Sequence, residues 1–267
     1  MARRRLDAEL VRRGLARSRE QAQQLISDGR VRIAGSTATK PATQVDEAAA
    51  VTVVEAPDGP DYVSRGAHKL LGALAAFDAA GTLVTGRRAL DAGASTGGFT
   101  DVLLRRWAAH VLAVDVGYGQ LAWSLRTDER VTVLDRTNVR SLTAADLPYR
   151  PELVVADLSF ISLRLVLPAF AELVAPGADL LLMVKPQFEV GREALGAGGV
   201  VRDPGQRAEA VLTVARAAAE LGLGTTGVGA SPLPGPSGNV EYFLHLRAGA
   251  PGPEPEDVER AVAAGPR

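Results

Sequence analysis

Short apolar runs alternate with helical patterns along most of the chain after Arg65. The runs are rich in Val and Leu and short enough to be buried strands. Between most of them, apolar residues recur every three or four positions, as on one face of a helix. This alternation predicts an α/β fold with an open, mostly parallel sheet and helices on both faces. The predicted strands are residues 88–93, 110–117, 131–135, 153–160, 179–188 and 241–247.

The stretch YVSRGAHKLLGALAAF, residues 62–77, leads into this region and has the apolar spacing of a helix. Its first part carries three basic residues, Arg65, His68 and Lys69. The helix dipole favours acids in a first turn and bases in a last turn. The three basic side chains are therefore expected to serve a partner outside the helix.

The first 55 residues follow a different pattern, that of two short helices and a small sheet. Gly14 and Gly29 fit the ends of the two helices, and Ser18 with Gln21 fits a capping box at the start of the second. The predicted helices are residues 6–14 and 18–29, and the predicted strands are 31–35 and 50–55.

Charge is distributed unevenly, although the whole chain has a net charge of only −1. Up to Lys40 there are ten basic and four acidic residues, a local charge of +6, so the remainder carries about −7. A basic end on an acidic body is typical of nucleic-acid binding. A solvated basic face with no partner is the alternative.

A Pro-, Gly- and Asp-rich segment, EAPDGPDYVSRG (residues 55–66), separates the two patterns. We therefore predict a basic domain over residues 1–58 and a linker over 59–66. An α/β domain is predicted over 67–248 and a tail over 249–267.

Several classes of protein and site are disfavoured by composition. The chain has no cysteine, which excludes disulfides and thiolate metal sites and fits a reducing compartment. The longest apolar run, LLLMV at residues 180–184, is far shorter than a membrane span. No signal-peptide core follows the basic N-terminus. His68, His110 and His245 are scattered, so we expect no metal site. A soluble cytoplasmic monomer is the expectation.

The stretch LDAGASTGGFTDVLLRRW places Gly93, Gly97 and Gly98 between a predicted strand and a predicted helix. Glycines there allow a tight turn and close approach of a ligand to the backbone. An ordinary strand-to-helix turn is the alternative. Ser95 stands where the dinucleotide fingerprint needs its second glycine, and no Walker motif follows.

Acidic residues end the neighbouring strands and indicate the charge of the ligand. Asp115, after the second strand, is placed to accept ribose hydroxyls, and Asp135, after the third, could meet an adenine. With Asp91 beside the glycine loop, these carboxylates suit cationic S-adenosylmethionine better than NAD. The candidate cofactor-binding residues are Asp91, Gly93, Ala94, Ser95, Gly97, Gly98, Asp115, Asp135, Asn138 and Asp157.

Six motifs, SRGAHKL, LDAGASTGGFT, DVGYGQLAW, ADLSFISL, VKPQFEVG and GPSGNVEYF, together resemble the FtsJ-like branch of Rossmann-type methyltransferases. RLDAELVRRGLARSREQAQQLISDGRVRIAG and the later KP resemble an S4-like RNA-binding domain. The combination is similar to the TlyA family of rRNA cytidine-2′-O-methyltransferases, often labelled hemolysins. The resemblance implies a seven-stranded sheet with an antiparallel last strand. It also implies S-adenosylmethionine as cofactor and ribosomal subunits as substrate, with cytidine in 16S and also 23S rRNA as the target.

The resemblance also implies a catalytic set of Lys69, Asp157, Lys185 and Glu241. Asp157 and Lys185 end predicted parallel strands and so reach one edge of the sheet. A ribose 2′-hydroxyl must lose its proton as it attacks a methyl carbon, and a free lysine is mostly protonated at neutral pH. A neighbouring cation favours the neutral amine. We expect Lys185 to be the general base.

The other three residues have supporting roles in this hypothesis. Lys69 would favour the neutral form of Lys185 or bind RNA. Asp157 would orient Lys185 and attract the sulfonium, and Glu241 would orient the lysines or bind the ribose. For any one of them, a surface salt bridge is the alternative.

The expected RNA contacts are the N-terminal arginines and the basic start of the 62–77 helix. Methylation of a pyrimidine C5 is excluded because it needs a cysteine, and DLSF does not match the usual motif of amino-group methylation. The alternatives are a membrane-active hemolysin and a non-catalytic ribosome-assembly factor. The candidate RNA-binding residues are Arg3, Arg4, Arg5, Arg17, Arg19, Arg30, Arg65 and His68.

Overall fold

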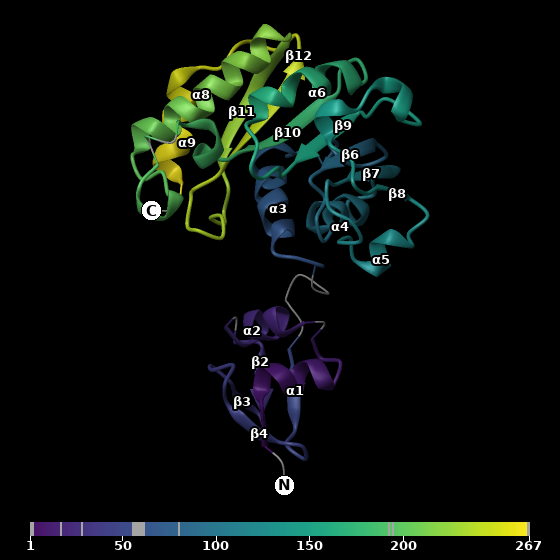
Figure 1. The fold of residues 1–267 in the computed structure, drawn as a ribbon, viewed down its shortest axis with the longest axis vertical. Helices are drawn as coiled ribbons and strands as arrows, with labels where there is room; N and C mark the ends of the chain where they lie inside the picture. The colour runs from purple at the N-terminus through teal and green to yellow at the C-terminus, as the bar shows by residue number, and fades with distance from the viewer. Residues whose placement is uncertain are drawn as a thin grey trace. The chain divides into compact units, whose positions relative to one another are not determined.

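The chain folds as two compact units, residues 1–61 and 62–267, and each is described by itself (Figure 1). The computed structural model describes residues 3–16, 18–27, 29–54, 62–79, 81–191, 193 and 195–265. Residues 59–61 of the predicted linker, and Arg17 among the predicted RNA contacts, therefore lie outside the described residues. The division between the units falls inside the predicted 59–66 joint.

The first unit packs two helices against short antiparallel strands. β1 pairs with β4, and β2 lies between β3 and β5. The hydroxyl of Ser18 accepts a hydrogen bond from the N–H of Gln21 at 3.1 Å, as an N-cap does. β1 has the sequence RRR, so no apolar pattern could predict it. The elements are β1 Arg3–Arg5, α1 Leu6–Arg12, α2 Arg19–Ser27, β2 Val31–Ile33, β3 Ser36–Thr37, β4 Gln44–Asp46 and β5 Val51–Val53.

The second unit is built on a seven-stranded sheet of order β11-β12-β10-β9-β6-β7-β8. Six of the strands run in the same direction, and β12 runs antiparallel to both of its neighbours. This confirms the predicted methyltransferase-type α/β fold. The strands are β6 Arg88–Ala92, β7 His110–Val114, β8 Val131–Leu134, β9 Leu153–Ala156, β10 Asp179–Val184, β11 Leu223–Ala230 and β12 Tyr242–Ala248.

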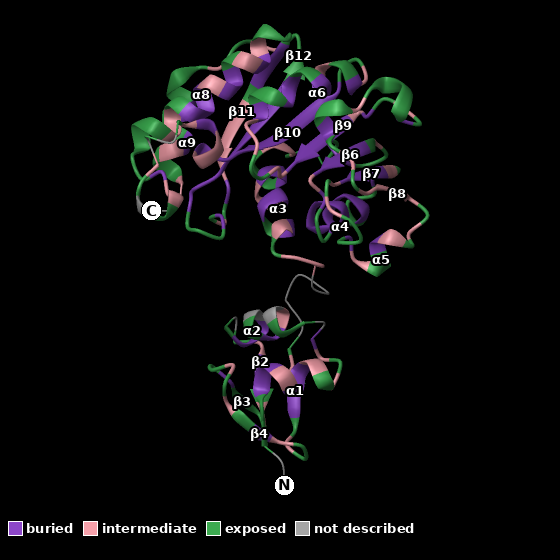
Figure 2. Cartoon of the chain, in the orientation of Figure 1, coloured by how far each residue is buried: buried purple, intermediate pink, exposed green. Residues whose placement is uncertain are grey.

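Helices cover both faces of this sheet, and its central strands are buried between them (Figure 2). Successive residues of β10 point to opposite faces, so Leu180 and Leu182 join one core cluster while Leu181 and Met183 join the other. The first cluster includes α6 and α8, and the second includes α3 and α4. The helices are α3 Gly66–Phe77, α4 Gly98–Arg105, α5 Trp123–Arg126, α6 Leu167–Leu173, α7 Pro186–Glu189, α8 Pro204–Glu220 and α9 Pro255–Ala264, with short 3-10 turns η1 Val139–Ser141, η2 Ala144–Asp146, η3 Leu163–Leu165 and η5 Ala197–Gly199.

Strand β11 has the sequence LGTTGVGA, which lacks a strand pattern and was not among the predicted strands. Its glycines make room for neighbours: a Cβ on Gly227 would lie 2.7 Å from the ring of Phe77 in α3. A Cβ on Gly224 would lie 1.9 Å from the carbonyl oxygen of Ala250. The strand therefore depends on tertiary packing, which its own sequence does not predict.

The segment set apart as a tail, from residue 249, packs onto the second unit. The N–H of Thr225 in β11 donates to the carbonyl of Pro251 at 2.8 Å. Helix α9 buries Val258 and Ala261, and Val258 joins the same core cluster as α8. The segment thus covers the outer edge strand of the sheet, which would otherwise offer unpaired backbone groups.

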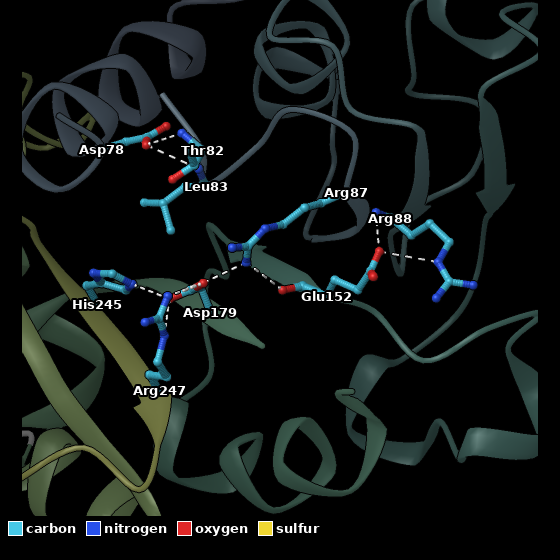
Figure 3. A network of polar contacts seen from close by, with 9 residues as sticks. All are labelled: Asp78, Thr82, Leu83, Arg87, Arg88, Glu152, Asp179, His245 and Arg247. Atoms are coloured by element: carbon cyan, nitrogen blue, oxygen red, sulfur yellow. Dashed lines mark hydrogen bonds and ion pairs between the residues drawn. The ribbon is translucent and has the colours of Figure 1, made fainter. Parts of the chain in front are cut away.

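A buried carboxylate organises the edge of the sheet where β10 begins (Figure 3). Asp179 is fully buried and accepts hydrogen bonds from His245, Arg247 and Arg87 at 2.6–2.8 Å. Burial alone would raise the pKa of Asp179, but these three donors together lower it below its ordinary value. The network joins β10, β12 and the entry to β6, at the opposite ends of the strands from the predicted site.

Candidate active site

The predicted catalytic residues meet at one edge of the second unit's sheet. Asp157 directly follows β9, Lys185 directly follows β10, and Glu241 directly precedes β12. Because β12 is antiparallel to β10, Val184 pairs with Tyr242 and the start of β12 lies at the carboxyl end of β10. Lys185 and Glu241, 56 positions apart in the sequence, are thus brought to the same edge of the sheet.

The four side chains form a chain of alternating charge. Lys69 Nζ lies 2.5 Å from Glu241 Oε2 and 3.9 Å from Asp157 Oδ2. Lys185 Nζ lies 2.6 Å from Asp157 Oδ1. The side chains of Lys69, Lys185 and Glu241 are 11%, 8% and 1% exposed, so these ion pairs are largely shielded from water. The basic residue that breaks the helix-dipole rule in α3 is therefore neutralised by a carboxylate 172 positions away.

Glu241 is held by the loop that connects β11 to β12. The N–H of Ser231 donates to the carbonyl of Glu241, and the N–H of Gly235 donates to that of Asn239, both at 2.8 Å. A Cβ on Gly235 would lie 2.6 Å from Glu241 Oε1. Glycine at 235 therefore allows the loop to pass directly over the carboxylate.

The loop after β9 adds a contact that the sequence analysis did not include. Lys185 Nζ donates a hydrogen bond to Ser159 Oγ at 2.8 Å. Further along, the buried carboxylate of Glu189 in α7 accepts from Ser162 Oγ at 2.5 Å and from the N–H of Leu163 at 2.7 Å. The loop carrying Asp157 and Ser159 is thereby tied to the turn carrying Lys185.

Asp91, in β6, is a fully buried carboxylate with spare hydrogen-bonding capacity. Its Oδ2 accepts from Thr100 Oγ1 at 2.6 Å, whereas its Oδ1 has no partner among the described residues. Burial raises the pKa of Asp91 to about 7, and the nearby carboxylates of Asp157 and Asp115 act in the same direction. A buried carboxylate of this kind is suited to a cationic ligand, which would stabilise its ionised form.

The glycine-rich turn between β6 and α4 is shaped by its neighbours. Gly93 has φ +83°, and a Cβ there would lie 2.8 Å from the carbonyl oxygen of Asp157. A Cβ on Gly97 would meet Leu125, and one on Gly98 would meet Ser64. Each glycine thus has a packing role, whatever ligand the turn binds. Ala94 is buried in the same turn and hydrogen-bonds to β7.

The carboxylate of Asp115 is already oriented, and it retains acceptor capacity. Its two oxygens accept from the N–H of Ser95 at 2.8 Å and the N–H of Gly117 at 2.7 Å. Each carboxylate oxygen can accept a further hydrogen bond. Asp115 therefore lies beside the glycine-rich turn, oriented and still able to bind hydroxyls.

The remaining predicted cofactor-binding residues, Asp135 and Asn138, have partners of their own. Asp135 is paired with Arg126, and the hydrogen bond from Arg126 lowers the pKa of Asp135. Asn138 is exposed and caps η1 by accepting from the N–H of Arg140 at 3.0 Å. Both follow β8, the strand at the end of the sheet away from the lysines.

Comparisons with known proteins agree with this geometry. A model described as FtsJ-like methyltransferase matches residues 62–248, and an S4 domain model matches residues 4–51. The sequence is 62% identical, over the whole of both chains, to the 16S/23S rRNA (cytidine-2′-O)-methyltransferase TlyA of Mycobacterium tuberculosis. The chain belongs to the TlyA family. It is accordingly a methyltransferase with an N-terminal S4 domain.

Other relatives of the TlyA family carry different names. The 23S rRNA (cytidine-2′-O)-methyltransferase TlyA of Campylobacter jejuni is 36% identical, over 69% of this chain and 70% of its own. Hemolysin A of Brachyspira hyodysenteriae is 34% identical, with coverage of 91% and 99%. A solved structure from Streptococcus thermophilus, named as a hemolysin, has a TM-score of 0.76 at 37% identity and covers 98% of this chain and 95% of its own.

In the S4 domain, the buried carboxylate of Asp7 and the half-exposed carboxylate of Asp46 hold several of the predicted RNA-binding arginines. Asp7 accepts from Arg5 at 2.9 Å and from Arg19 at 3.1 Å. The hydrogen bond from Arg5 is the largest influence that holds the pKa of Asp7 well below its usual range. Arg3 is paired with Asp46 at 3.4 Å. These guanidinium groups remain exposed or half-exposed, and the carboxylates fix their orientation.

The other predicted RNA contacts vary in their surroundings. Arg4 is exposed in β1, whereas Arg30 donates to the carbonyl of Val54 at 2.9 Å. In the methyltransferase unit, Arg65 is exposed at the start of α3, and exposed His68 lies edge-on to the ring of Tyr62.

Exposed aromatic side chains follow several strands of the methyltransferase unit. Phe160, three residues after Asp157, is 92% exposed and has a left-handed backbone with φ +64°. Its ring lies 5.4 Å from that of Phe188 in α7. Tyr118 and Trp123 are also exposed after β7. A bulky residue in such a conformation marks a strained loop, which is a frequent feature of functional sites.

Two negative findings complete the site. Within the described residues, no three His, Cys, Asp or Glu side chains are grouped in a way that could hold a metal ion. No helix in that part of the chain is long and apolar enough to cross a membrane.

Proposed function

We propose that this chain transfers a methyl group from S-adenosylmethionine to the ribose 2′-hydroxyl of cytidine in ribosomal RNA, in 16S and also 23S rRNA. The observation that carries the proposal is the buried Glu241–Lys69–Asp157–Lys185 chain at the carboxyl edge of the sheet. It pairs two amines with two carboxylates beside the glycine-rich turn. The identity to a full-length relative named for this activity supports the substrate.

The cofactor is proposed from the charge of the neighbouring groups. Asp91, with its unpartnered Oδ1, and Asp115, with spare acceptor capacity, would hold a cationic nucleoside. Ala94 and the backbone of the glycine-rich turn would lie against it. When bound, S-adenosylmethionine would supply a methyl carbon bonded to a positively charged sulfur, and that sulfur would leave as a neutral thioether.

Lys185 is proposed as the general base. It accepts the proton of the 2′-hydroxyl as that oxygen attacks, which contributes on the order of 10²–10⁴-fold to such reactions. Asp157 lies 2.6 Å away and stabilises the ammonium that forms. Lys69 lies 3.9 Å from the same Asp157 carboxylate and so shares its negative charge with Lys185. Glu241 balances Lys69 and keeps it in place.

Recognition of the RNA is assigned to the S4 domain and to the exposed groups near the tetrad, which is the set of Lys69, Asp157, Lys185 and Glu241. Arg4, Arg5 and Arg19 would bind phosphates, which dominate affinity for RNA. Phe160 offers an exposed ring on which an unstacked base can lie. The cytoplasm is the proposed location because the substrate is ribosomal RNA.

The proposal is tested by methyl transfer from tritiated cofactor to 30S and 50S subunits that lack the modification, with the product mapped. Lys185→Ala should abolish transfer while cofactor binding persists. Lys185→Arg should also be inactive, because arginine keeps the charge but cannot lose a proton at neutral pH. Arg216→Ala, on the exposed face of α8, is the control and should remain active. Activity in either Lys185 variant would contradict the assignment.

The two alternatives make different predictions. A membrane-active hemolysin should release dye from phospholipid vesicles even as Lys185→Ala without cofactor. A non-catalytic assembly factor should bind subunits without methylating them. The complete tetrad argues against the non-catalytic assembly factor. No helix among the described residues is long and apolar enough to cross a membrane, so the hemolysin gains no support from the structure.

A further inference from the structure

We propose that Ser159 is a positioning residue for methyl transfer, whose hydroxyl holds the amine of Lys185 so that its lone pair faces the RNA ribose. The inference rests on the proposed role of Lys185 as base. Ser159 lies two residues after Asp157 in the exposed loop that follows β9. Neither the sequence pattern nor the charged tetrad assigns it a role.

The first argument is directional. Lys185 Nζ donates to Ser159 Oγ at 2.8 Å with hydrogen-bond geometry. Asp157 Oδ1 lies closer, at 2.6 Å, yet no donor among the described residues meets hydrogen-bond geometry at that atom. Asp157 thus provides an attractive charge, and Ser159 is the group that fixes the direction of an N–H bond.

The second argument follows from the shape of an amine. A neutral lysine amine has two N–H bonds and one lone pair, and it rotates freely about the bond from Cε to Nζ unless a partner holds it. An N–H directed to Ser159, with the other drawn toward Asp157, leaves one tetrahedral direction for the lone pair. Orientation of this kind lowers the barrier because the base no longer has to find its geometry during the reaction.

The third argument concerns the loop that carries Ser159. Glu189, whose side chain is 1% exposed, accepts from Ser162 Oγ and from the N–H of Leu163. Glu189 lies in α7, which begins directly after Lys185. The strained backbone of Phe160 lies between Ser159 and the residues bound to Glu189. It persists because both ends of the loop are held. The Ser159 hydroxyl is therefore fixed relative to Lys185.

The two lysines differ in their hydrogen-bond partners. Lys69 Nζ is bound to buried Glu241 and lies 3.9 Å from Met183 Sδ, with no hydroxyl partner among the described residues. Ser159 is exposed, so it lies where a ribose can reach the Lys185 end of the charge chain. In the reaction, the 2′-oxygen forms its bond to the methyl carbon, the carbon–sulfur bond breaks, and the proton moves from the oxygen to Lys185.

The test compares Ser159→Ala and Ser159→Thr in single-turnover methyl transfer to unmodified subunits, at saturating cofactor and across pH. Ser159→Ala should lower the maximal rate by about 10-fold, as expected for loss of one hydrogen bond to a charged group. Ser159→Thr, which keeps the hydroxyl at an exposed position, should restore most of the rate. Cofactor affinity, RNA affinity and the melting temperature should stay at their wild-type values.

The pH profile provides a readout that a merely structural role would not move. The Ser159 hydroxyl stabilises the ammonium more than the amine, because a charged donor forms the stronger bond. In Ser159→Ala the acidic limb of the rate profile should therefore move to lower pH, by about half a unit to one unit. Ser124→Ala, an exposed serine in α5, is the matched control and should show neither effect.

Three outcomes would overturn the inference: an unchanged rate in Ser159→Ala, a loss that threonine does not restore, or a loss accompanied by an equal fall in cofactor affinity. Lys185→Ala, measured in parallel, separates this failure from that of the proposed function. If Lys185→Ala is inactive and Ser159→Ala is unaffected, the base assignment survives and the role of Ser159 does not. If Lys185→Ala is active, the base assignment itself fails.

Discussion

The ionisation of Asp91 should control how tightly the proposed cofactor binds. Burial, together with the charges of Asp157 and Asp115, raises the pKa of Asp91 to about 7 in the ligand-free protein. Asp91 is then about 10% ionised at pH 6 and about 90% ionised at pH 8. A cationic ligand that binds the ionised form should therefore bind about 10-fold more tightly at pH 8 than at pH 6. The sign follows from a raised pKa: the neutral form dominates below pH 7 and must lose its proton before it can pair with a cation.

The assay is calorimetric titration of S-adenosylmethionine at the two pH values, with Asp91→Asn as the comparison. Asparagine preserves the shape and the contact with Thr100 but cannot ionise. The ligand's own titration affects both proteins equally, so the ratio of their affinities isolates Asp91. We expect this ratio to change about 10-fold between pH 6 and pH 8. A ratio that is the same at both pH values would refute the reasoning.

Two further predictions concern the buried Asp179 network and the loop that passes over Glu241. Asp179→Asn leaves Arg87 and Arg247 without a buried carboxylate and should lower the free energy of unfolding by about 3–5 kcal/mol in urea denaturation. Because the pKa of Asp179 is lowered by folding, its contribution is present above about pH 4 and lost as pH falls further, so the difference between wild type and variant should shrink in acid. Gly235→Ala places a methyl group 2.6 Å from Glu241 Oε1 and should slow methyl transfer at least 10-fold with unchanged cofactor affinity. Gly252→Ala, which meets no atom within 4 Å, is the control, and equal rates in the two variants would contradict the positioning of Glu241 by this loop.

The fold was largely predictable because the strands that surround the site have strong local patterns. β9 and β10 are continuous apolar runs, and each ends at the charged residue that it positions. β11 was not predictable, since its glycines are selected by contact with Phe77 and with the chain after β12. β1 was missed for a related reason: three arginines form a strand only because β4 pairs with them.

The candidate site divides in the same way. Strand position predicted that Asp157 and Lys185 reach one edge of the sheet, and the family resemblance supplied the full set of two lysines and two carboxylates. Ser159 and Glu189 were not predicted as site residues, because no local sequence pattern distinguishes them from other serines and glutamates. Their roles depend on which groups the loop meets: Lys185 Nζ for Ser159, and Ser162 and Leu163 for Glu189.

The sequence by itself determined the kind of protein, since apolar periodicity defines the sheet and the charge distribution defines a basic end. It also placed Lys69 at the start of a helix, where the helix dipole disfavours a positive charge. Only the tertiary structure decided what that charge is for. The antiparallel direction of β12 brings Glu241 to within 2.5 Å of Lys69, and the parallel pairing of β9 with β10 sets Asp157 between the two lysines. Local sequence cannot encode these distances, because strand order and direction are properties of the whole sheet.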